Sequence, residues 1–259
     1  MTSLLSATAA GGSVVVAQFM GRGDKDKVSA AAKQLFMVVT SMATTFTLIM
    51  TLFSSQLIDL LYPGLEMSVR SNAQIYFLIL AFSYPFMALY NSGASMFRAV
   101  GNSKISMKVS LLSNLMNIGG NALLIIGFKM GVAGAAYSTL ASRMMCAIVI
   151  IALMQKNPEL AIHGKWRFET VLVKKIFFVA VPQGVENSLF QIGKLLVSTM
   201  VASLGTMVIT ANSVCENIAN INNIINTAMG MALLTTVGQS IGAGDEAQAK
   251  YYYFRTITD

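Results

Sequence analysis

The sequence predicts an all-α protein, a polytopic membrane helix bundle, and three observations support this fold class. Apolar residues make up 55% of the chain and charged residues only 11%, whereas soluble domains spend about a quarter of their residues on charge. The apolar residues form uncharged runs of about 18 residues or more, which is long enough to cross a bilayer as a helix. These runs lack the alternation typical of a membrane β-barrel, and hydrocarbon offers their backbone no partner outside a helix.

The apolar runs predict seven membrane spans, separated by polar connections. When successive connections are assigned to alternate faces, 14 of the 18 basic residues fall on one face. The positive-inside rule makes that face cytoplasmic, and this distribution disfavours a nucleic-acid interpretation of the net charge of +7. The predicted spans are residues 3–20, 35–62, 73–95, 108–128, 131–154, 176–204 and 207–241.

One pattern, Val-x-Gln-x-x-Gly-x-Gly-Asp, occurs twice in the chain. It reads VAQFMGRGD at residues 16–24 and VGQSIGAGD at residues 237–245, so the second copy lies 221 residues after the first. Six predicted spans separate the copies, and because six is even, both copies are expected at the cytoplasmic end of a span. The chain is therefore predicted to contain parallel halves related by an axis along the membrane normal.

Each copy of the pattern suits the end of one helix and the start of the next. The first glycine, Gly21 or Gly242, is expected to take the left-handed conformation that closes a helix. The aspartate, Asp24 or Asp245, is expected to cap the following helix. An alternative is that the pattern is only a turn, with no ligand role. The residues that mark the duplication are Gln18, Gly21, Gly23, Asp24, Gln239, Gly242, Gly244 and Asp245.

The repeat distance also predicts the domain organisation. Residues 1–155 are expected to form an N-terminal lobe that lacks its first helix, and residues 156–175 a cytoplasmic loop between the lobes. Residues 176–259 would then supply the first two helices of a C-terminal lobe. A fragment with such open helix faces is not expected to be stably functional alone.

Two features together resemble one transporter family. They are the ending GQ-x-x-GAGD-x-x-x-A and the stretch VPQGVENSLFQIGKLLVSTMVASLGT at residues 181–206. Both resemble the multidrug and toxic compound extrusion (MATE) transporters, and the similarity covers essentially the whole chain, from the second to the eighth of twelve helices.

The resemblance implies a multi-pass protein of the bacterial inner membrane that is monomeric at full length. Such a protein would export small cationic or amphipathic compounds in exchange for Na⁺ or H⁺, alternating between outward- and inward-open states. Its partners would be the lipid bilayer and these substrates, not nucleic acid, and it would need no cofactor beyond the coupling ion.

Glu186 is the first candidate for coupling, because a polar residue within a span is costly and usually functional. It lies about ten residues into its span, roughly 15 Å along a helix axis. The family often carries an acidic residue here, proposed as a proton or cation acceptor; the alternative is a structural carboxylate paired with a neighbouring helix. Pro182, one turn earlier, is expected to kink the helix, and Pro85 to kink its own helix and help it bend during gating.

The last predicted span carries a stripe of polar residues at steps of three or four, which places them on one helical face. Neutral amides there would suit a polyspecific cavity, and the alternative is interhelical hydrogen bonding. Glu216 is hypothesised to face Glu186 and form an acidic cation site in the second lobe. The stripe consists of Asn212, Glu216, Asn220, Asn223 and Asn226.

Asn117, Asn121 and Thr139 match the family's first-lobe cation site, where related transporters read Asn-x-x-x-Asp with a Thr on the next helix. This chain has Asn121 in place of the Asp, and it lacks the first helix, which supplies another Asp. Arg143 lies one turn past Thr139 and is expected on the same face. We hypothesise that its guanidinium replaces the mobile cation there, so that coupling rests on Glu186; the alternative is a bundle hydrogen-bond donor.

Other functions are ranked lower. A lipid-linked saccharide flippase of the same superfamily should carry clustered basic residues in its cavity, but only Arg143 and Lys194 lie inside the predicted spans, away from their ends. A non-functional truncated fragment is a further alternative. An enzyme is not expected, because the sequence contains no phosphate-binding loop, metal-ligand cluster or nucleophile–base set.

Overall fold

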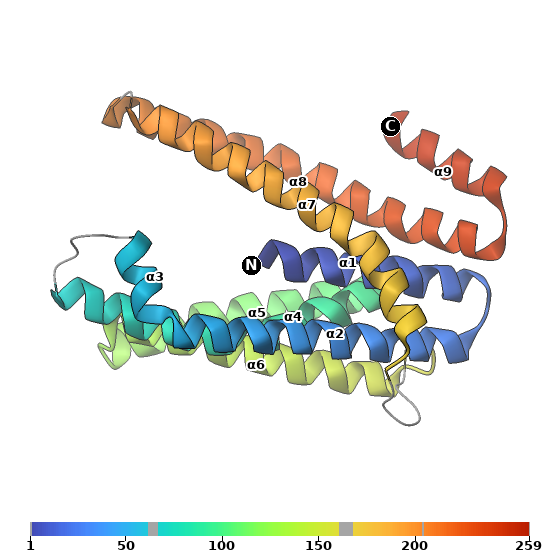
Figure 1. Cartoon of the computed structure of the whole chain (residues 1–259), viewed down its shortest axis with the longest axis horizontal. Coiled ribbons are helices and arrows are strands. Elements are labelled where there is room, and N and C mark those ends of the chain that lie inside the picture. The colour runs from blue at the N-terminus through green and yellow to red at the C-terminus, as the bar shows by residue number, and fades with distance from the viewer. Residues whose placement is uncertain (1, 62–66, 161–167, 204, 259) are drawn as a thin grey trace.

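The computed structural model describes residues 2–61, 67–160, 168–203 and 205–258, and within these ranges all regular elements are helices (Figure 1). The predicted all-α class is therefore confirmed. The seven residues 161–167 of the predicted inter-lobe loop lie outside the described ranges. In chain order the elements are α1 (Thr2–Gly21), α2 (Lys25–Leu52), α3 (Ser54–Leu61), α4 (Met67–Ala99), α5 (Ser103–Asn121), a π-helix (Ala122–Gly127), α6 (Gly131–Lys156), α7 (Thr170–Ser203), α8 (Thr206–Ala243) and α9 (Glu246–Thr258).

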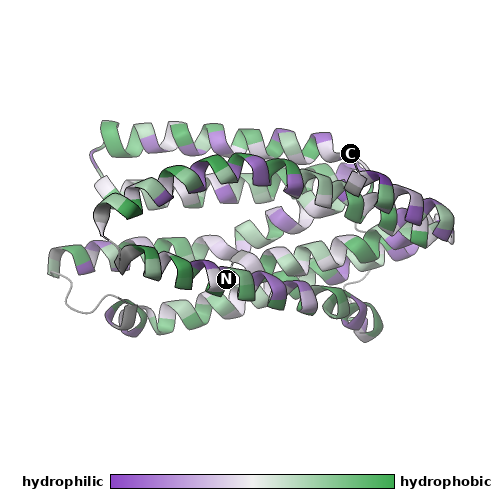
Figure 2. Cartoon of the chain, turned by 90° about the horizontal axis from the view of Figure 1, so that it is seen from above, coloured by the Kyte–Doolittle hydropathy of each residue, from purple (hydrophilic) through white to green (hydrophobic). Residues whose placement is uncertain are grey.

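Six of these helices are long and apolar enough to cross a membrane by length and composition. A seventh span was predicted at α7, which is a long helix, but the polar stretch from Pro182 to Ser188 lowers its hydropathy. Hydrophobic residues occur along all the long helices (Figure 2). Many large apolar side chains on them are exposed, as expected for helices that contact lipid. The six candidate spans are Ser3–Gly21, Lys25–Leu52, Val69–Ala99, Ser103–Gly127, Gly131–Lys156 and Met207–Ala243.

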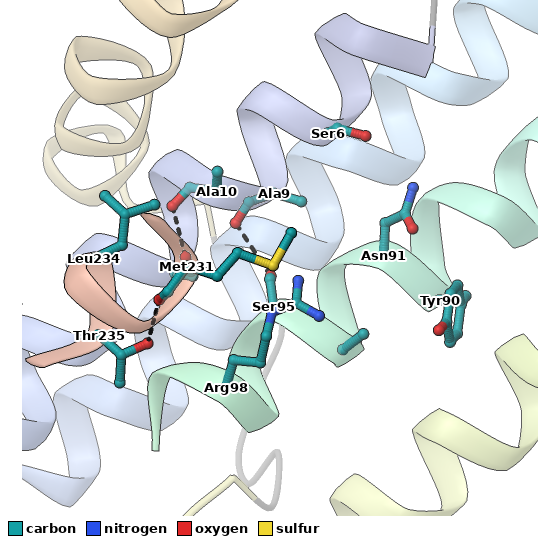
Figure 3. A pocket seen from close by; sticks show the side chains of 12 residues that line it. Ser6, Ala9, Ala10, Tyr90, Asn91, Ser95, Arg98, Met231, Leu234 and Thr235 are labelled. Carbon is teal, nitrogen blue, oxygen red and sulfur yellow. Dashed lines mark hydrogen bonds between the residues drawn. The ribbon is translucent and has the colours of Figure 1, made fainter. Parts of the chain in front are cut away.

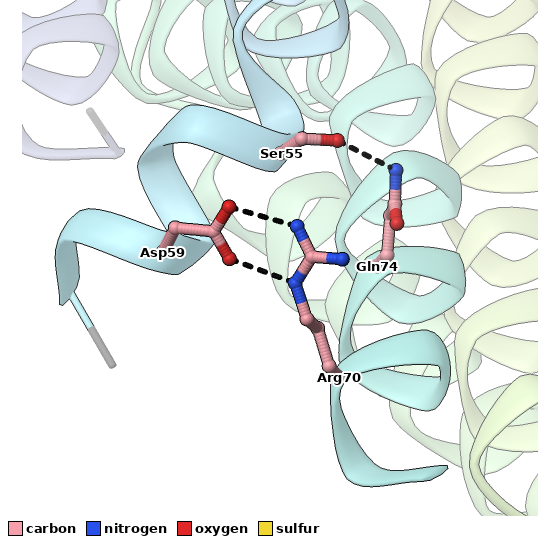
Figure 4. Close-up of polar contacts among 4 residues, drawn as sticks. All are labelled: Ser55, Asp59, Arg70 and Gln74. Atoms are coloured by element: carbon pink, nitrogen blue, oxygen red, sulfur yellow. Dashed lines mark hydrogen bonds and ion pairs between the residues drawn. The ribbon is translucent and has the colours of Figure 1, made fainter. Parts of the chain in front are cut away.

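The span predicted at residues 35–62 is two helices rather than one. The chain turns after α2, and α3 then packs against the start of α4. Two side-chain contacts hold it there (Figure 4): Arg70 donates two hydrogen bonds to Asp59, at 2.7 and 2.8 Å, and Gln74 Nε2 donates to Ser55 Oγ at 3.0 Å. These contacts join α3 to α4.

The span predicted at residues 108–128 also departs from a uniform helix. Its last part, Ala122–Gly127, is π-helical, a form that is uncommon and often found at functional sites. Phe128 N–H donates to Leu123 O at 3.0 Å, which closes this wider turn. The π-helix therefore begins directly after Asn121, one of the predicted site residues.

Pro85 and Pro182 lie inside α4 and α7, as predicted. A proline cannot donate its backbone nitrogen, so the carbonyl four residues earlier lacks its helical partner. For Pro85 that carbonyl belongs to Ala81, and it accepts a hydrogen bond from the Thr47 hydroxyl on α2 at 2.9 Å. The bond ties α4 to α2 at the position of the proline.

Helices α1, α2, α4, α5 and α6 pack together, and α7 and α8 pack against them mainly through α1. The core contains fully buried side chains from several helices, including Leu5, Leu35, Phe97 and Ile150. The α7–α8 pair crosses α1 obliquely, and its connecting end lies away from the other helices (Figure 1). The α1–α2 and α8–α9 turns lie at the same end of the bundle, in agreement with the predicted parallel repeat.

Candidate functional site

The first copy of the repeated pattern ends α1 with a left-handed glycine. Gly23 has φ of 72°, and its N–H donates to Met20 O at 3.0 Å. Asp24 N–H reaches back to Phe19 O at 3.2 Å. Together these two bonds form a Schellman motif, which satisfies carbonyls that the helix end leaves free.

The second copy ends α8 in the same way. Gly244 has φ of 81° and donates to Ile241 O at 3.1 Å, while Asp245 N–H donates to Ser240 O at 3.0 Å. Each of these residues lies 221 positions after its counterpart in the first copy. The duplication in sequence is therefore also a duplication of backbone geometry.

The aspartate of each copy caps the helix that follows. Asp24 Oδ1 accepts from Lys27 N–H at 3.1 Å, and Asp245 Oδ1 accepts from Gln248 N–H at 2.8 Å. The Lys27 ammonium also lies 2.7 Å from Asp24 Oδ2. Hydrogen bonds from the side chain and backbone of Lys27 hold the pKa of Asp24 below its ordinary value.

The prediction that Gly21 and Gly242 are the left-handed residues is wrong. The second glycine of each copy closes the helix, and the first lies within the last turn, where α1 and α8 cross. A Cβ on Gly21 would lie 2.0 Å from Gln239 O, and a Cβ on Gly242 would lie 2.1 Å from Gln18 O. Neither distance leaves room for a side-chain carbon. We call this pairing of Gln18 with Gly242 and of Gly21 with Gln239 the crossing contact.

The glutamine side chains of the two copies have different surroundings. Gln239 Nε2 donates to Ala99 O at 2.7 Å and so joins α8 to the last residue of α4. Gln18, in contrast, lines a cavity of about 690 Å³ between α1, α7 and α8. The shared glutamine thus supports helix contact in one copy and faces a cavity in the other.

This cavity, here called the interface cavity, has mostly apolar walls with a few polar groups. Besides Gln18, its polar lining includes Gln183 and Asn187 from α7 and Thr227 from α8, and Tyr253 of α9 completes it. Gln183 and Asn187 are four residues apart and share one helical face. Sequence reasoning missed both residues, although they flank Glu186 in the same polar stretch.

A second, smaller cavity of about 250 Å³ lies between α1, α4 and α8 (Figure 3). Arg98, in the last turn of α4, points into it beside Asn91 and Ser95. Ser95 Oγ donates to Ala9 O at 3.1 Å, which joins α4 to α1 next to the cavity. Arg98 belongs to the 14 basic residues that the sequence assigns to the cytoplasmic face, and the sequence gives it no further role.

The predicted acidic and amide residues of the second half are not gathered into the interface cavity. Glu186 is exposed on α7, and Glu216 is partly buried on α8, where Oε1 accepts from Asn212 Nδ2 at 3.3 Å. The remaining stripe residues are exposed, and the α8 residues that line the cavity begin at Thr227. These exposed residues are Asn220, Asn223 and Asn226.

The predicted residues of the first half, in contrast, form a connected chain. Asn117 Nδ2 donates to Thr139 Oγ1 at 3.2 Å, and Asn121 Nδ2 donates to Asn117 Oδ1 at 3.1 Å. Asn121 Oδ1 is buried, and among the described residues it has no hydrogen-bond partner. Arg143 does not join this chain, because its guanidinium donates to Ser83 Oγ on α4.

These features define the class of protein: a polytopic helical membrane protein built from parallel repeats whose equivalent ends meet. The chain belongs to the MatE family, whose family model matches residues 1–123 and 182–258. This family membership confirms the resemblance to MATE transporters drawn from the sequence.

Two curated relatives show how much of the family's length is present. The chain is 24% identical over 260 residues to the uncharacterized transporter YisQ of Bacillus subtilis, covering 96% of this chain and 55% of that protein. It is 26% identical over 256 residues to the probable multidrug resistance protein NorM of Thermotoga maritima, covering 94% and 53%. The chain therefore spans about half the length of the curated relatives it matches.

Solved structures share the fold. An outward-facing multidrug resistance MATE family transporter of the MOP superfamily matches with a TM-score of 0.86, over 99% of this chain and 57% of that one. The crystal structure of a MATE in complex with MaL6 matches with a TM-score of 0.89, over 99% and 58%. Sequence identity is 18% in both cases, so these matches concern the fold alone.

Proposed function

We propose that this protein takes part in exporting cationic or amphipathic compounds across a bacterial inner membrane, in exchange for Na⁺ or H⁺. Membership of the MatE family and the names of its bacterial relatives support this proposal. The observation that carries it is the interface cavity, which lies where α1 of the first half meets α7 and α8 of the second. A site between two halves can be exposed to either side of the membrane if the halves rock against each other.

The lining of the interface cavity suits varied amphipathic guests. Apolar walls bury hydrophobic parts of a ligand, and a few polar groups orient it. The amide oxygens of Gln18, Gln183 and Asn187 can accept hydrogen bonds from an ammonium group, and neutral amides impose no single geometry. The cavity therefore fits cations of several shapes better than one specific ligand.

Two sites are proposed for the coupling ion. In the second half, Glu186 and Glu216 are acidic residues on the helices that form the cavity. In the first half, the unpartnered Asn121 Oδ1 lies next to Asn117 and Thr139, and hard cations prefer such oxygen ligands. Arg143 donates to Ser83 and not to these residues, so the hypothesis that its guanidinium replaces the cation there is not supported. Because Asn121 carries no charge, we propose that coupling rests on Glu186.

A transport assay tests the proposal. The full-length protein that contains this chain is reconstituted in liposomes, and efflux of the fluorescent cation ethidium is followed with either a Na⁺ gradient or a pH gradient. We expect one gradient to drive efflux and Glu186→Gln to abolish it, whereas Lys194→Gln, a matched control on the same helix, leaves it unchanged. An efflux rate that depends on neither the Na⁺ gradient nor the pH gradient would contradict the proposal.

The site of coupling is tested separately by direct binding of ²²Na⁺. If coupling rests on Glu186, Asn121→Ala has little effect and Asn121→Asp adds a cation site in the first half. Retention of specific Na⁺ binding after Glu186→Gln, together with its loss after Asn121→Ala, would refute this assignment.

The flippase alternative is not favoured by the family match or by the cavity. Binding a pyrophosphate group calls for several basic side chains. Among the described residues, those that line the interface cavity include no Lys or Arg.

A further inference from the structure

Arg98 is a charged residue that points into the bundle although the cytoplasmic surface is close. It is the next-to-last residue of α4, and an arginine at such a helix end can extend to the membrane surface and keep its charge in water. Its side chain instead points into the smaller cavity between α1, α4 and α8, here called the Arg98 cavity (Figure 3). An unpaired charge away from bulk water is costly, so this orientation calls for a compensating group.

Nothing in the described part of the chain supplies that group. Arg98 is partly buried, and within residues 2–61, 67–160, 168–203 and 205–258 its guanidinium makes no hydrogen bond and no ion pair. The cavity lining among these residues includes no Asp or Glu. Arg143 differs in this respect, because its guanidinium donates to Ser83 Oγ. The described lining of the Arg98 cavity therefore leaves a positive charge unbalanced.

The other polar groups of the Arg98 cavity suit an anion. Asn91 and Ser95 lie on the face of α4 that carries Arg98, because they are seven and three residues before it. Ser95 Oγ donates to backbone carbonyls, one of them Ala9 O, and so joins α4 to α1. The Asn91 amide and the Tyr90 hydroxyl donate no hydrogen bond within the described residues, so both donors are available to a ligand. A guanidinium with further donors beside it is an arrangement that binds carboxylate and phosphate groups.

We propose that Arg98, with Asn91 and Tyr90, forms a subsite for one oxyanion, a carboxylate or a phosphate group, beside the interface cavity. This subsite rests on the proposed export function and extends it to compounds that carry a negative group as well as a positive one. The Arg98 cavity has a volume of about 250 Å³, whereas cavities that hold drug-sized molecules measure about 300–1,000 Å³. It therefore fits one end of a compound rather than a whole one.

The two cavities share a wall, which indicates where the rest of the compound lies. Ser6 and Ala10 of α1 and Met231 and Leu234 of α8 line both of them. Serine and alanine are small, and methionine is unbranched and adapts its shape readily, so this wall can yield to a ligand. A compound whose cationic part lies near the amides of the interface cavity can then reach Arg98 with its oxyanion.

A lipid phosphate is the second source of an oxyanion, and the depth of the cavity disfavours it. Ser13 and Thr235 line the Arg98 cavity, and each lies eight residues before the last residue of its helix, α1 or α8. At a rise of about 1.5 Å per residue, they lie about 12 Å from the cytoplasmic ends of these helices. Lipid phosphates lie in the headgroup layer outside the hydrocarbon core, so a compound held between the halves fits better.

Binding of a matched pair of dyes tests the subsite. Rhodamine B carries a cationic ring system and a carboxylate, and its ethyl ester has the same cation without the negative charge. The full-length protein that contains this chain is purified in detergent, and the Kd of each dye is measured by fluorescence polarisation. We expect Arg98→Gln to raise the Kd of rhodamine B relative to that of the ester by about tenfold, because hydrogen bonds between charged partners are the strong ones.

Two further variants sharpen this test. Arg98→Lys keeps the charge but loses the paired N–H donors, so we expect a smaller increase in the ratio of the two Kd values. Arg22→Gln is the matched control, because it removes one exposed positive charge from the same side of the bundle, in the turn after α1. Its ratio should equal that of the parent protein.

Circular dichroism and size-exclusion chromatography confirm that each variant is folded. If Arg98→Gln does not fold, Asn91→Leu keeps the guanidinium and should still raise the ratio. A ratio that equals that of the parent protein in every folded variant of Arg98 and Asn91 would overturn the proposal.

Adding phosphatidylglycerol to the same assay separates the two sources of the oxyanion. If the compound carries the oxyanion, the lipid should leave the Kd of rhodamine B unchanged. Competition by the lipid that Arg98→Gln abolishes would assign the oxyanion to a lipid phosphate and overturn its assignment to a transported compound.

The dye ratio and the ethidium assay can fail independently. A ratio that depends on Arg98, in a protein that does not export ethidium, would support the subsite and contradict the exporter. Gradient-driven export of ethidium by a protein whose dye ratio does not depend on Arg98 would support the exporter and overturn the subsite.

Discussion

The two copies of the repeated pattern share a backbone and differ in what their side chains do. Both end a helix with a left-handed glycine, and both cap the next helix with an aspartate. Yet Gln239 donates to the end of α4, while Gln18 faces the interface cavity. The comparison shows that duplicated sequence preserves the backbone geometry more strictly than it preserves side-chain roles.

The largest expected effect tests the shared backbone. Gly23→Ala and Gly244→Ala each force a side chain into the left-handed region, which costs about 1–2 kcal/mol. Neither Cβ would meet another atom within 4 Å, so the cost comes from conformation alone. We expect thermal unfolding in detergent, followed by circular dichroism, to show equal destabilisation by the two variants. A clear difference between their unfolding temperatures would contradict an equivalent backbone role for the two glycines.

A smaller and unequal effect is expected at the glutamines. Gln239→Leu removes the hydrogen bond to Ala99 O, and a typical hydrogen bond contributes about 1 kcal/mol. Gln18→Leu should leave the unfolding temperature nearly unchanged and instead weaken binding of a fluorescent cation in the interface cavity. Equal destabilisation by the two variants would show that the glutamines share one role after all.

The smallest effect is expected at the exposed caps. Asp24→Ala should lower the unfolding temperature slightly and Asp24→Asn less, because asparagine also caps helices well. The pKa of Asp24 is lowered in the folded state, so its contribution is present above the unfolded-state pKa and is lost as pH falls through the folded-state value. A pH titration of the unfolding temperature should therefore show the Asp24→Ala difference at neutral pH and its disappearance in acid.

The fold could be predicted largely from the sequence, because apolar run length and the spacing of the repeat are local signals. The placement of Gln18 and Gln239 at the same end of the bundle followed from counting spans. Element boundaries were less predictable. After the break near Phe53, α3 packs against α4 through contacts between residues distant in sequence, such as Asp59 with Arg70, which no local pattern reveals.

The candidate site was predictable only in part, since a cavity depends on how helices cross. Asn117, Asn121 and Thr139 were found through spacing and resemblance, and the structure links them by hydrogen bonds. The sequence prediction did not include Gln183 and Asn187, because it selected only the charged residue of this polar stretch. That residue, Glu186, lies on a different face of α7. The role of Gly21 was misassigned because a glycine at a helix end suggests a turn before it suggests a neighbouring backbone.

The hydrogen bond from Thr47 to the carbonyl left free by Pro85 constrains how this molecule can move. A proline with a free carbonyl behaves as a joint, whereas this one is braced by the adjacent helix. α2 and α4 should therefore swing as a single rigid arm, with the flexing displaced to the short links at the ends of the helices. Thr47→Val removes this hydrogen bond and should let α4 bend at Pro85 relative to α2, while both helices remain helical.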